Sequence, residues 1–187
     1  MNHAYIAMGS NLDEPHRTRL DFLRAATREL GASAGLEVCA VSSVYESPAL
    51  QAPADKSGPD NLRPSEEPQP PYLNAVVHVR TSLSPDALLE RCLDIERRHG
   101  RVRSAGRRWE SRTLDLDIVY MEGVHLASED LTVPHPGLAE RRFVLEPLAE
   151  IAPGLLIGPP LDASVEYLLS VCPDEAIPTR LRLDEPL

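Results

Sequence analysis

Two aspartates alternate with aliphatic residues in the segment RTLDLDIVY, which runs from Arg112 to Tyr120. Successive side chains of a β-strand point to opposite faces, so Asp115 and Asp117 would share one face and the aliphatic residues the other. Two carboxylates at this spacing inside a domain are costly unless a cation or a proton lies between them, and oxygen ligands suit Mg²⁺. The segment therefore predicts a strand over residues 113–120 with a candidate metal site. The alternative is a solvent-facing strand whose acids pair with arginines.

The residues just before this strand are rich in arginine. Seven arginines lie between residues 97 and 112 against one acid, Glu110, although the whole chain has 19 basic and 29 acidic residues and a formal charge of −10. The overall charge opposes general attraction to nucleic acid or anionic lipid, but the local cluster could bind a small polyanion. Its loop arginines are Arg101, Arg103, Arg108 and Arg112.

Arginine binds phosphate oxygens through paired hydrogen bonds, and a position in a loop suggests closure over a phosphorylated ligand. The alternative is a solvated charge run that pairs with acids such as Glu90 and Glu96. The only tryptophan, Trp109, lies inside this polar segment. It is better explained as packing on a ligand or anchoring a closed loop than as a core residue.

The apolar spacing predicts the order of secondary structure. Strands are expected at residues 5–8, 38–46, 72–81 and 113–120, and residues 9–11 suit either a turn or a helix cap. One helix is predicted by the spacing of Leu20, Leu23, Thr27 and Leu30, with Gly31 as its stop. A second helix would begin at Ser84 as its cap, with Pro85 in the first turn, and end at Gly100.

At 187 residues the chain fits a single domain, expected over residues 1–187. The order strand, helix, strand, strand, helix, strand favours an α+β sandwich, in which helices cover one face of an antiparallel sheet in the split β-α-β arrangement. Short, proline-punctuated elements are expected from about residue 124 onward.

A proline-rich segment interrupts this pattern at about residues 51–71. It has six prolines, several charged residues and almost nothing apolar to bury. We therefore expect a mobile loop, which is either a tolerated surface insertion or a lid beside a site.

The cysteines and the first residues of the sequence indicate in which cell compartment the protein is expected. Cys39, Cys92 and Cys172 are far apart and lack the spacing of a metal site or a disulfide framework. The first residues lack a basic region followed by a long apolar stretch, and no segment reaches membrane-spanning length. We expect a soluble, cytoplasmic monomer that binds neither nucleic acid nor membrane.

Two further motifs could bind a ligand. Tyr72 and Asn74 are two residues apart and so share a strand face, where they could stack on and hydrogen-bond a flat heterocycle; the alternative is a half-buried strand with a capping asparagine. His135 lies between two prolines, shortly before Arg141 and Phe143. It could contact phosphate, although a lone histidine is usually structural or exposed.

Taken in this order, the motifs resemble the hydroxymethyl-dihydropterin pyrophosphokinases of folate biosynthesis. The resemblance runs to about Pro153 and rests on AYIAMGSNL (4–12), VSSVYESP (41–48), YLNA (72–75), Glu96, GRVR (100–103), RW (108–109), RTLDLD (112–117), LTVPH (131–135) and RRF (141–143). The RTLDLDI and LTVPH segments are highly specific in combination.

The resemblance implies a ferredoxin-like fold and a set of site residues. ATP would donate pyrophosphate to 6-hydroxymethyl-7,8-dihydropterin with two Mg²⁺ ions bound, and AMP would leave. By position, the metal ligands would be Asp115 and Asp117. The ATP contacts would be Glu96, Arg101, Arg103, Arg112, Ile118, His135 and Arg141, and Glu96 would orient a loop arginine. The pterin contacts would be Ser47, Pro48, Leu50, Tyr72, Asn74, Trp109 and Phe143. The catalytic set would be Arg101, Arg103, Arg108, Trp109, Arg112 and the two aspartates, with Arg108 and Trp109 in a mobile loop.

Three departures from the family pattern bear on loop dynamics and affinity rather than on the reaction. Ser47-Pro48-Ala49-Leu50 differs from the usual T-P-P-like start of the family's substrate loop, and the proline-rich insertion follows it. The segment 104–109 is one residue longer than in many members of the family.

Two other classes of function stay open at this point. A nucleotide-binding sensor module of the same fold would use the arginines but gain nothing from two carboxylates. A metal-dependent phosphohydrolase would use the carboxylates but would not need the pocket of Tyr72, Asn74 and Phe143.

Overall fold

The computed structural model describes residues 1–49, 69–101 and 111–187. Along these residues the elements are β1 (Asn2–Ser10), α1 (Arg19–Gly31), β2 (Leu36–Val41), β3 (Tyr45–Ser47), β4 (Tyr72–Thr81), α2 (Pro85–Arg98), β5 (Asp115–Met121), β6 (Leu126–Ala127), β7 (Thr132–Val133), a 3-10 helix (Leu138–Glu140), α3 (Arg142–Ile151), β8 (Leu156–Ile157), β9 (Ala163–Ser164), α4 (Val165–Ser170) and β10 (Thr179–Arg180). The proline-rich loop predicted at 51–71 lies outside the described residues except for 69–71.

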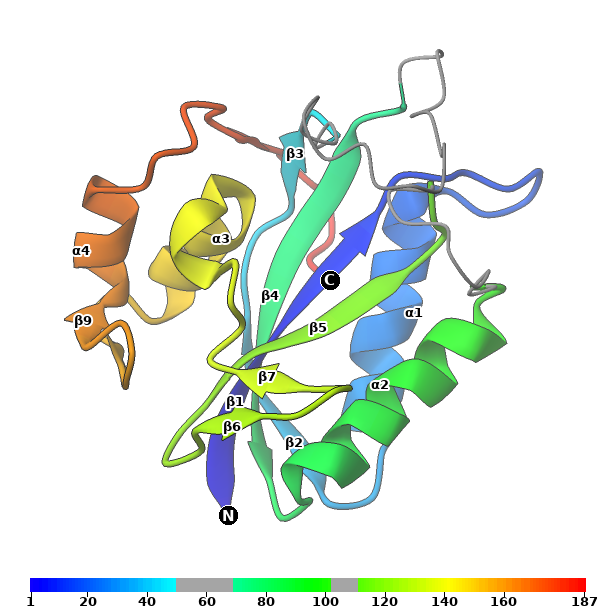
Figure 1. Ribbon diagram of the computed structural model, residues 1–187. Coiled ribbons are helices and arrows are strands. Elements are labelled where there is room, and N and C mark those ends of the chain that lie inside the picture. Colours follow the sequence, from blue (N-terminus) through cyan, green and yellow to red (C-terminus); the bar gives the residue numbers. More distant parts are fainter. Residues whose placement is uncertain (50–68, 102–110) are drawn as a thin grey trace, which may run out of the picture.

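An antiparallel sheet forms the centre of the fold (Figure 1). Its strand order is β10-β3-β4-β1-β5, and β2 also pairs with β4. Strand β1 lies between β4 and β5 and is antiparallel to both. Because β1 and β2 are joined through α1 while β4 lies between them, the arrangement is the predicted split β-α-β unit. The α+β ferredoxin-like prediction is thus confirmed.

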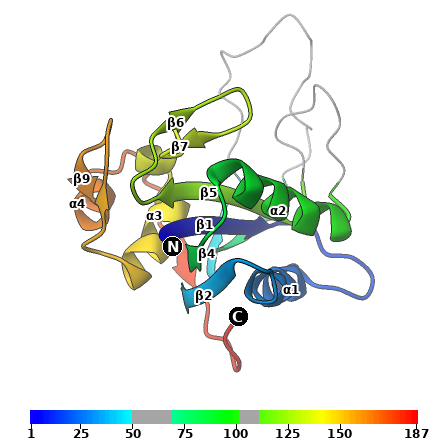
Figure 2. The ribbon, with the colours of Figure 1, turned by 90° about the horizontal axis from the view of Figure 1, so that it is seen from below.

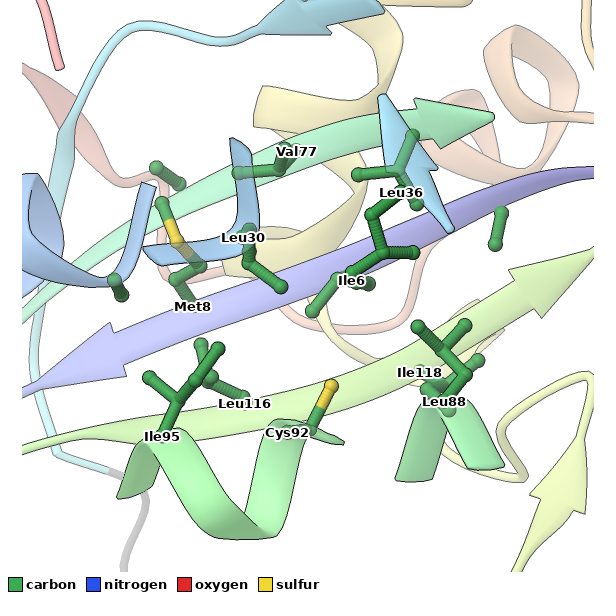
Figure 3. Close-up of a cluster of buried hydrophobic side chains, with 14 of the residues drawn as sticks. Ile6, Met8, Leu30, Leu36, Val77, Leu88, Cys92, Ile95, Leu116 and Ile118 are labelled. Carbon is green, nitrogen blue, oxygen red and sulfur yellow. The ribbon is translucent and has the colours of Figure 1, made fainter. Parts of the chain in front are cut away.

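Helices α1 and α2 cover one face of the sheet, as expected from the spacing of their apolar residues. Figure 3 shows Ile6, Met8, Leu116 and Ile118 of the strands packed against Leu30, Leu88, Cys92 and Ile95 of the helices. The Ser84 hydroxyl accepts a hydrogen bond from Ala87 N, so the predicted cap of α2 is confirmed. Gly100 follows this helix with φ of +80°, a conformation that glycine adopts without strain.

The C-terminal part of the chain covers the opposite face, which the sequence did not predict. In Figure 2, α3 and α4 lie on the other side of the strands from α1 and α2. Val144, Leu145 and Leu148 of α3 pack there with Tyr5 and Val76 in a second hydrophobic cluster. The sheet is therefore buried on both faces.

The single strand predicted at 38–46 was wrong, since β2 and β3 are separate strands that both pair with β4. The register of β2 shifts between Val38 and Ala40, and the chain then leaves the ladder at Ser42. There the Ser42 hydroxyl accepts a hydrogen bond from Val76 N at 2.9 Å, in place of a backbone carbonyl. A hydroxyl that competes with the backbone for hydrogen bonds cannot be recognised from hydrophobic alternation.

The start of α1 also differs from the prediction of a possible cap at residues 9–11. The cap is Thr18, whose side chain accepts from Asp21 N while the Asp21 carboxylate accepts from Thr18 N. This reciprocal capping box satisfies two donors at the helix start, so α1 begins only at Arg19.

Candidate active site

Asp115 and Asp117 lie together on one face of β5, as predicted. In the ladder with β1 they stand opposite Gly9 and Ala7, and all four residues line one pocket of about 200 Å³. Leu116, between them, points to the core under α1 and α2. The small residues of β1 leave the space into which the two carboxylates point.

Two arginines bind the Asp115 carboxylate. Arg101 donates to its Oδ1, and Arg112 Nη1 donates to its Oδ2 at 2.6 Å. The two guanidinium groups come from opposite ends of the segment 102–110, which lies outside the described residues. The structure thus brings together the acid and two members of the predicted arginine cluster.

Glu96 is buried beneath this pair and has 1% of its surface exposed. Its Oε1 accepts a hydrogen bond from Leu116 N at 2.8 Å and also forms an ion pair with Arg101. A buried carboxylate with these partners fixes Arg101 relative to β5. This agrees with the predicted role of Glu96 in orienting an arginine, and Glu96 does not line the pocket.

The electrostatic setting of Asp117 differs from that of Asp115. Burial first, and then the charge of Asp115, raise the pKa of Asp117 well above its usual range, while Arg141 opposes the rise. A carboxylate that is costly to ionise at this place would be stabilised by a bound cation.

His135 lines the same pocket and is held as a neutral imidazole. Its Nδ1 accepts a hydrogen bond from Gly137 N at 3.0 Å, and its backbone N donates to Val119 O at 2.9 Å. Burial, followed by repulsion from Arg141, lowers the pKa of His135 to about 4. The ring therefore presents Nε2 as an N–H donor, which suits a phosphate oxygen.

The same pocket also has aromatic and amide side chains in its lining. Tyr72 and Phe143 line it, together with Ser47, Pro48 and Asn74. Asn74 Nδ2 donates to Ser47 Oγ at 2.9 Å, so the side chain orientation is fixed. Its Oδ1 lies 3.7 Å from where a Cβ on Gly9 would stand, and it therefore faces the pocket floor as an acceptor.

For several predicted site residues, the structure does not show a side chain that lines the pocket. Ile118 is 3% exposed and belongs to the core on the opposite face, so its ATP contact stays a prediction. Leu50, Arg103, Arg108 and Trp109 lie outside the described residues.

Asn11 supports the site from outside the pocket lining, and the sequence pattern assigned it no role in binding. It is 1% exposed, its Oδ1 accepts from Arg112 N at 2.7 Å, and its Nδ2 donates to Pro70 O at 3.3 Å and Ser111 Oγ at 3.2 Å. It therefore ties the start of β4 to the segment that carries Arg112. Its place directly after the strand that carries Gly9 was the only signal that could have indicated this role.

The described residues contain neither a cluster of metal-ligating side chains nor a membrane-spanning helix. Within residues 1–49, 69–101 and 111–187, no three His, Cys, Asp or Glu side chains are grouped so as to hold a metal ion. Over the same residues, no helix combines the length and the apolar character needed to cross a membrane.

Residues 5–153 match the family of 7,8-dihydro-6-hydroxymethylpterin-pyrophosphokinases (HPPK). The chain belongs to this family. It is 39% identical over 158 residues to the 2-amino-4-hydroxy-6-hydroxymethyldihydropteridine pyrophosphokinase of Methylorubrum extorquens, covering 84% of this chain and 87% of the relative. It is 42% identical over 150 residues to the HPPK enzyme of the same name from Bacillus subtilis, covering 80% and 78%.

Solved structures agree with HPPK membership at the level of the fold. A mutant HPPK-DHPS protein from Plasmodium falciparum superposes with a TM-score of 0.64 at 14% identity, covering 90% of this chain and 43% of that one. The chain thus spans less than half the length of these structural relatives, which at this identity support the HPPK fold alone.

Proposed function

We propose that the protein transfers the pyrophosphoryl group of ATP to 6-hydroxymethyl-7,8-dihydropterin in the pocket between β1, β4, β5 and α3. The family carries out this reaction in folate biosynthesis, with ATP as co-substrate. The observation that carries the proposal is one pocket with two kinds of lining side chain. Carboxylates and arginines line it together with two aromatic rings and a fixed amide.

The aromatic and amide side chains fit a pterin. Tyr72 and Phe143 come from β4 and from the start of α3, so a flat ring could stack between them. Asn74 is held by Ser47 with its Oδ1 toward the pocket, where it could accept an N–H from the edge of the heterocycle. Ser47 and Pro48 would form the wall beside this edge.

The charged side chains fit the triphosphate. Arg112 and Arg141 line the pocket, Arg101 is bound to Asp115, and His135 offers a neutral N–H. Guanidinium groups bind phosphate oxygens in pairs and would replace their contacts to Asp115 when the nucleotide enters. Arg103, Arg108 and Trp109 complete the proposed catalytic set from the sequence pattern alone.

Asp115 and Asp117 fit two Mg²⁺ ions as ligands. Mg²⁺ keeps several waters and is usually held by one or two carboxylates together with substrate phosphates, so a site with two acids is sufficient. The buried position of Asp117 beside Asp115 indicates the same charge requirement. When bound, the metal would neutralise charge on both sides of the reacting phosphorus.

In the proposed reaction, the pterin hydroxyl oxygen bonds to the β-phosphorus as the bond from that phosphorus to the α-phosphate oxygen breaks. The pyrophosphoryl group moves as one unit, and AMP leaves. The protein's residues align the hydroxyl and the phosphate and hold charge in place, which accounts for most of the barrier reduction in such reactions. Asp115 or Asp117 could accept the hydroxyl proton.

The test is the stoichiometry of products. With ATP, Mg²⁺ and the reduced pterin, we expect AMP in proportion to pterin diphosphate, and Asp117→Ala should remove at least ~100-fold of the rate. Formation of ADP would indicate an ordinary kinase, and pterin-independent phosphate release would indicate a phosphohydrolase. Either result would overturn the assignment.

A further inference from the structure

The match to the family ends at residue 153, yet the chain continues to Leu187 and its tail returns to α3 and β3. We propose that residues 174–181, called here the C-terminal segment, position two walls of the pocket, namely the start of α3 with Phe143 and the strand β3 with Ser47. The inference rests on the proposed function, because it concerns the affinity for the pterin at that same site.

The first contact is at the start of α3. The cap residue Arg141 provides no side-chain hydrogen bond to this helix. Asp174 supplies one from the tail: its Oδ2 accepts from Arg142 N at 3.2 Å, and its backbone O accepts from Arg142 Nε at 2.7 Å. A carboxylate at a helix start satisfies a free N–H and interacts favourably with the helix dipole. Arg142 thus becomes a fixed point between Arg141 and Phe143, which both line the pocket.

The second contact is at β3, on the opposite wall. Thr179 and Arg180 of β10 pair with Glu46 and Tyr45, and Leu181 N donates to Val44 O at 2.8 Å. Without β10, the three-residue strand β3 would be an edge of the sheet. Ser47, the last residue of this strand, accepts the hydrogen bond that fixes Asn74.

A polar network joins the last turns of α3 to β10 and to the residues before and within β3. Glu150, near the end of α3, accepts hydrogen bonds from Ser43 N at 2.9 Å and Tyr45 Oη at 3.1 Å. Arg180 donates from Nη2 to Glu150 Oε1 and from Nε to Ser43 Oγ, both at 2.9 Å. The C-terminal segment therefore holds α3 and β3 at a fixed separation.

The anchored walls carry Phe143 and Ser47, which we assign to the pterin, and also Arg141, which we assign to ATP. Asp115 and Asp117 belong to β5, which the C-terminal segment does not pair with in the described sheet. Loss of the anchor should loosen the spacing of Phe143 and Ser47 while the carboxylates keep their places. The expected kinetic signature is a larger loss of pterin binding than of ATP binding, because two proposed pterin contacts, Phe143 and Ser47, but only one proposed ATP contact, Arg141, lie next to the anchored positions.

The test compares Asp174→Ala and Arg180→Ala with the exposed neighbours Glu175→Ala and Arg182→Ala as matched controls. We expect the KM for the pterin to rise roughly three- to tenfold in the first pair, about the size of the net contribution of one intramolecular hydrogen bond. The KM for ATP should rise by less than the KM for the pterin, kcat should stay within about twofold, and the controls should match the wild type. Asp174→Asn keeps an oxygen acceptor for Arg142 N and should recover most of the pterin affinity.

A lower melting temperature with an unchanged pterin KM, or an equal rise in both KM values, would overturn the inference. Direct binding of the pterin, followed by its fluorescence, separates this question from the reaction itself. If the wild type binds pterin but forms no AMP, the transfer reaction is contradicted while the inference is still tested by the Kd of Asp174→Ala. If that Kd equals the wild-type value, the C-terminal segment has no positioning role.

Discussion

Asn11→Ala is the substitution whose effect can be worked out most directly. Its buried side chain makes three hydrogen bonds, to Arg112 N, Pro70 O and Ser111 Oγ. Alanine removes all three and leaves the Arg112 N–H without this acceptor. The backbone hydrogen bond from Asn11 N to Arg112 O, at 3.1 Å, is kept.

The cost is set mainly by the shortest contact. Each intramolecular hydrogen bond contributes about 1 kcal/mol net, and a buried donor left unsatisfied costs about 1–3 kcal/mol. The contact to Arg112 N is 2.7 Å long, whereas the other two are 3.3 Å and 3.2 Å and should contribute less. We expect the free energy of unfolding to fall by roughly 2–4 kcal/mol.

Urea unfolding followed by circular dichroism measures this loss, with Asn2→Ala as a control because Asn2 is an exposed asparagine on β1. The rate of AMP formation should also fall, since Arg112 would lose its fixed position beside Asp115. A loss of stability below about 1 kcal/mol would show that water replaces the Asn11 contacts and would refute the reasoning.

Four further outcomes are expected. Gly9→Ala should fold normally but raise the KM for the pterin, because the new methyl group would stand 3.6 Å from Tyr72 Cδ1 and 3.8 Å from Asp115 Cβ, inside the pocket; a lower melting temperature with unchanged KM would contradict this. The folded protein should keep His135 neutral at pH values well below 6.5, the ordinary pKa of histidine, so the unfolded chain takes up the proton at a higher pH than the folded chain. The free energy of unfolding should therefore fall as the pH drops from 6.5 toward 4. Urea unfolding of His135→Gln over this pH range should show a shallower fall of that free energy. Leu116→Ala, at a side chain 2% exposed, should cost about 2–5 kcal/mol in the same unfolding assay, and a smaller loss would mean that the core relaxes around it. Chelation of Mg²⁺ should abolish AMP formation, with recovery on adding Mg²⁺ back, and activity that persists without divalent ions would contradict the metal role of Asp115 and Asp117.

The sequence by itself determined the features that depend on local periodicity. Alternation along residues 112–120 was sufficient to place both aspartates on one face and Leu116 in the core. The cap at Ser84 and the glycine that follows α2 were readable for the same reason, because each acts within one turn of the chain. The order of strands and helices then limited the fold to the split β-α-β arrangement.

Other features were decided only by the tertiary structure, because their partners are distant in sequence. The split of β2 from β3 depends on Ser42 binding Val76, and the role of Asn11 depends on residues 59 and 100 positions away. The cover of the second sheet face and the return of Asp174 to α3 depend on how the C-terminal part packs. A periodic pattern shows which face of an element is apolar, but not which distant element covers it.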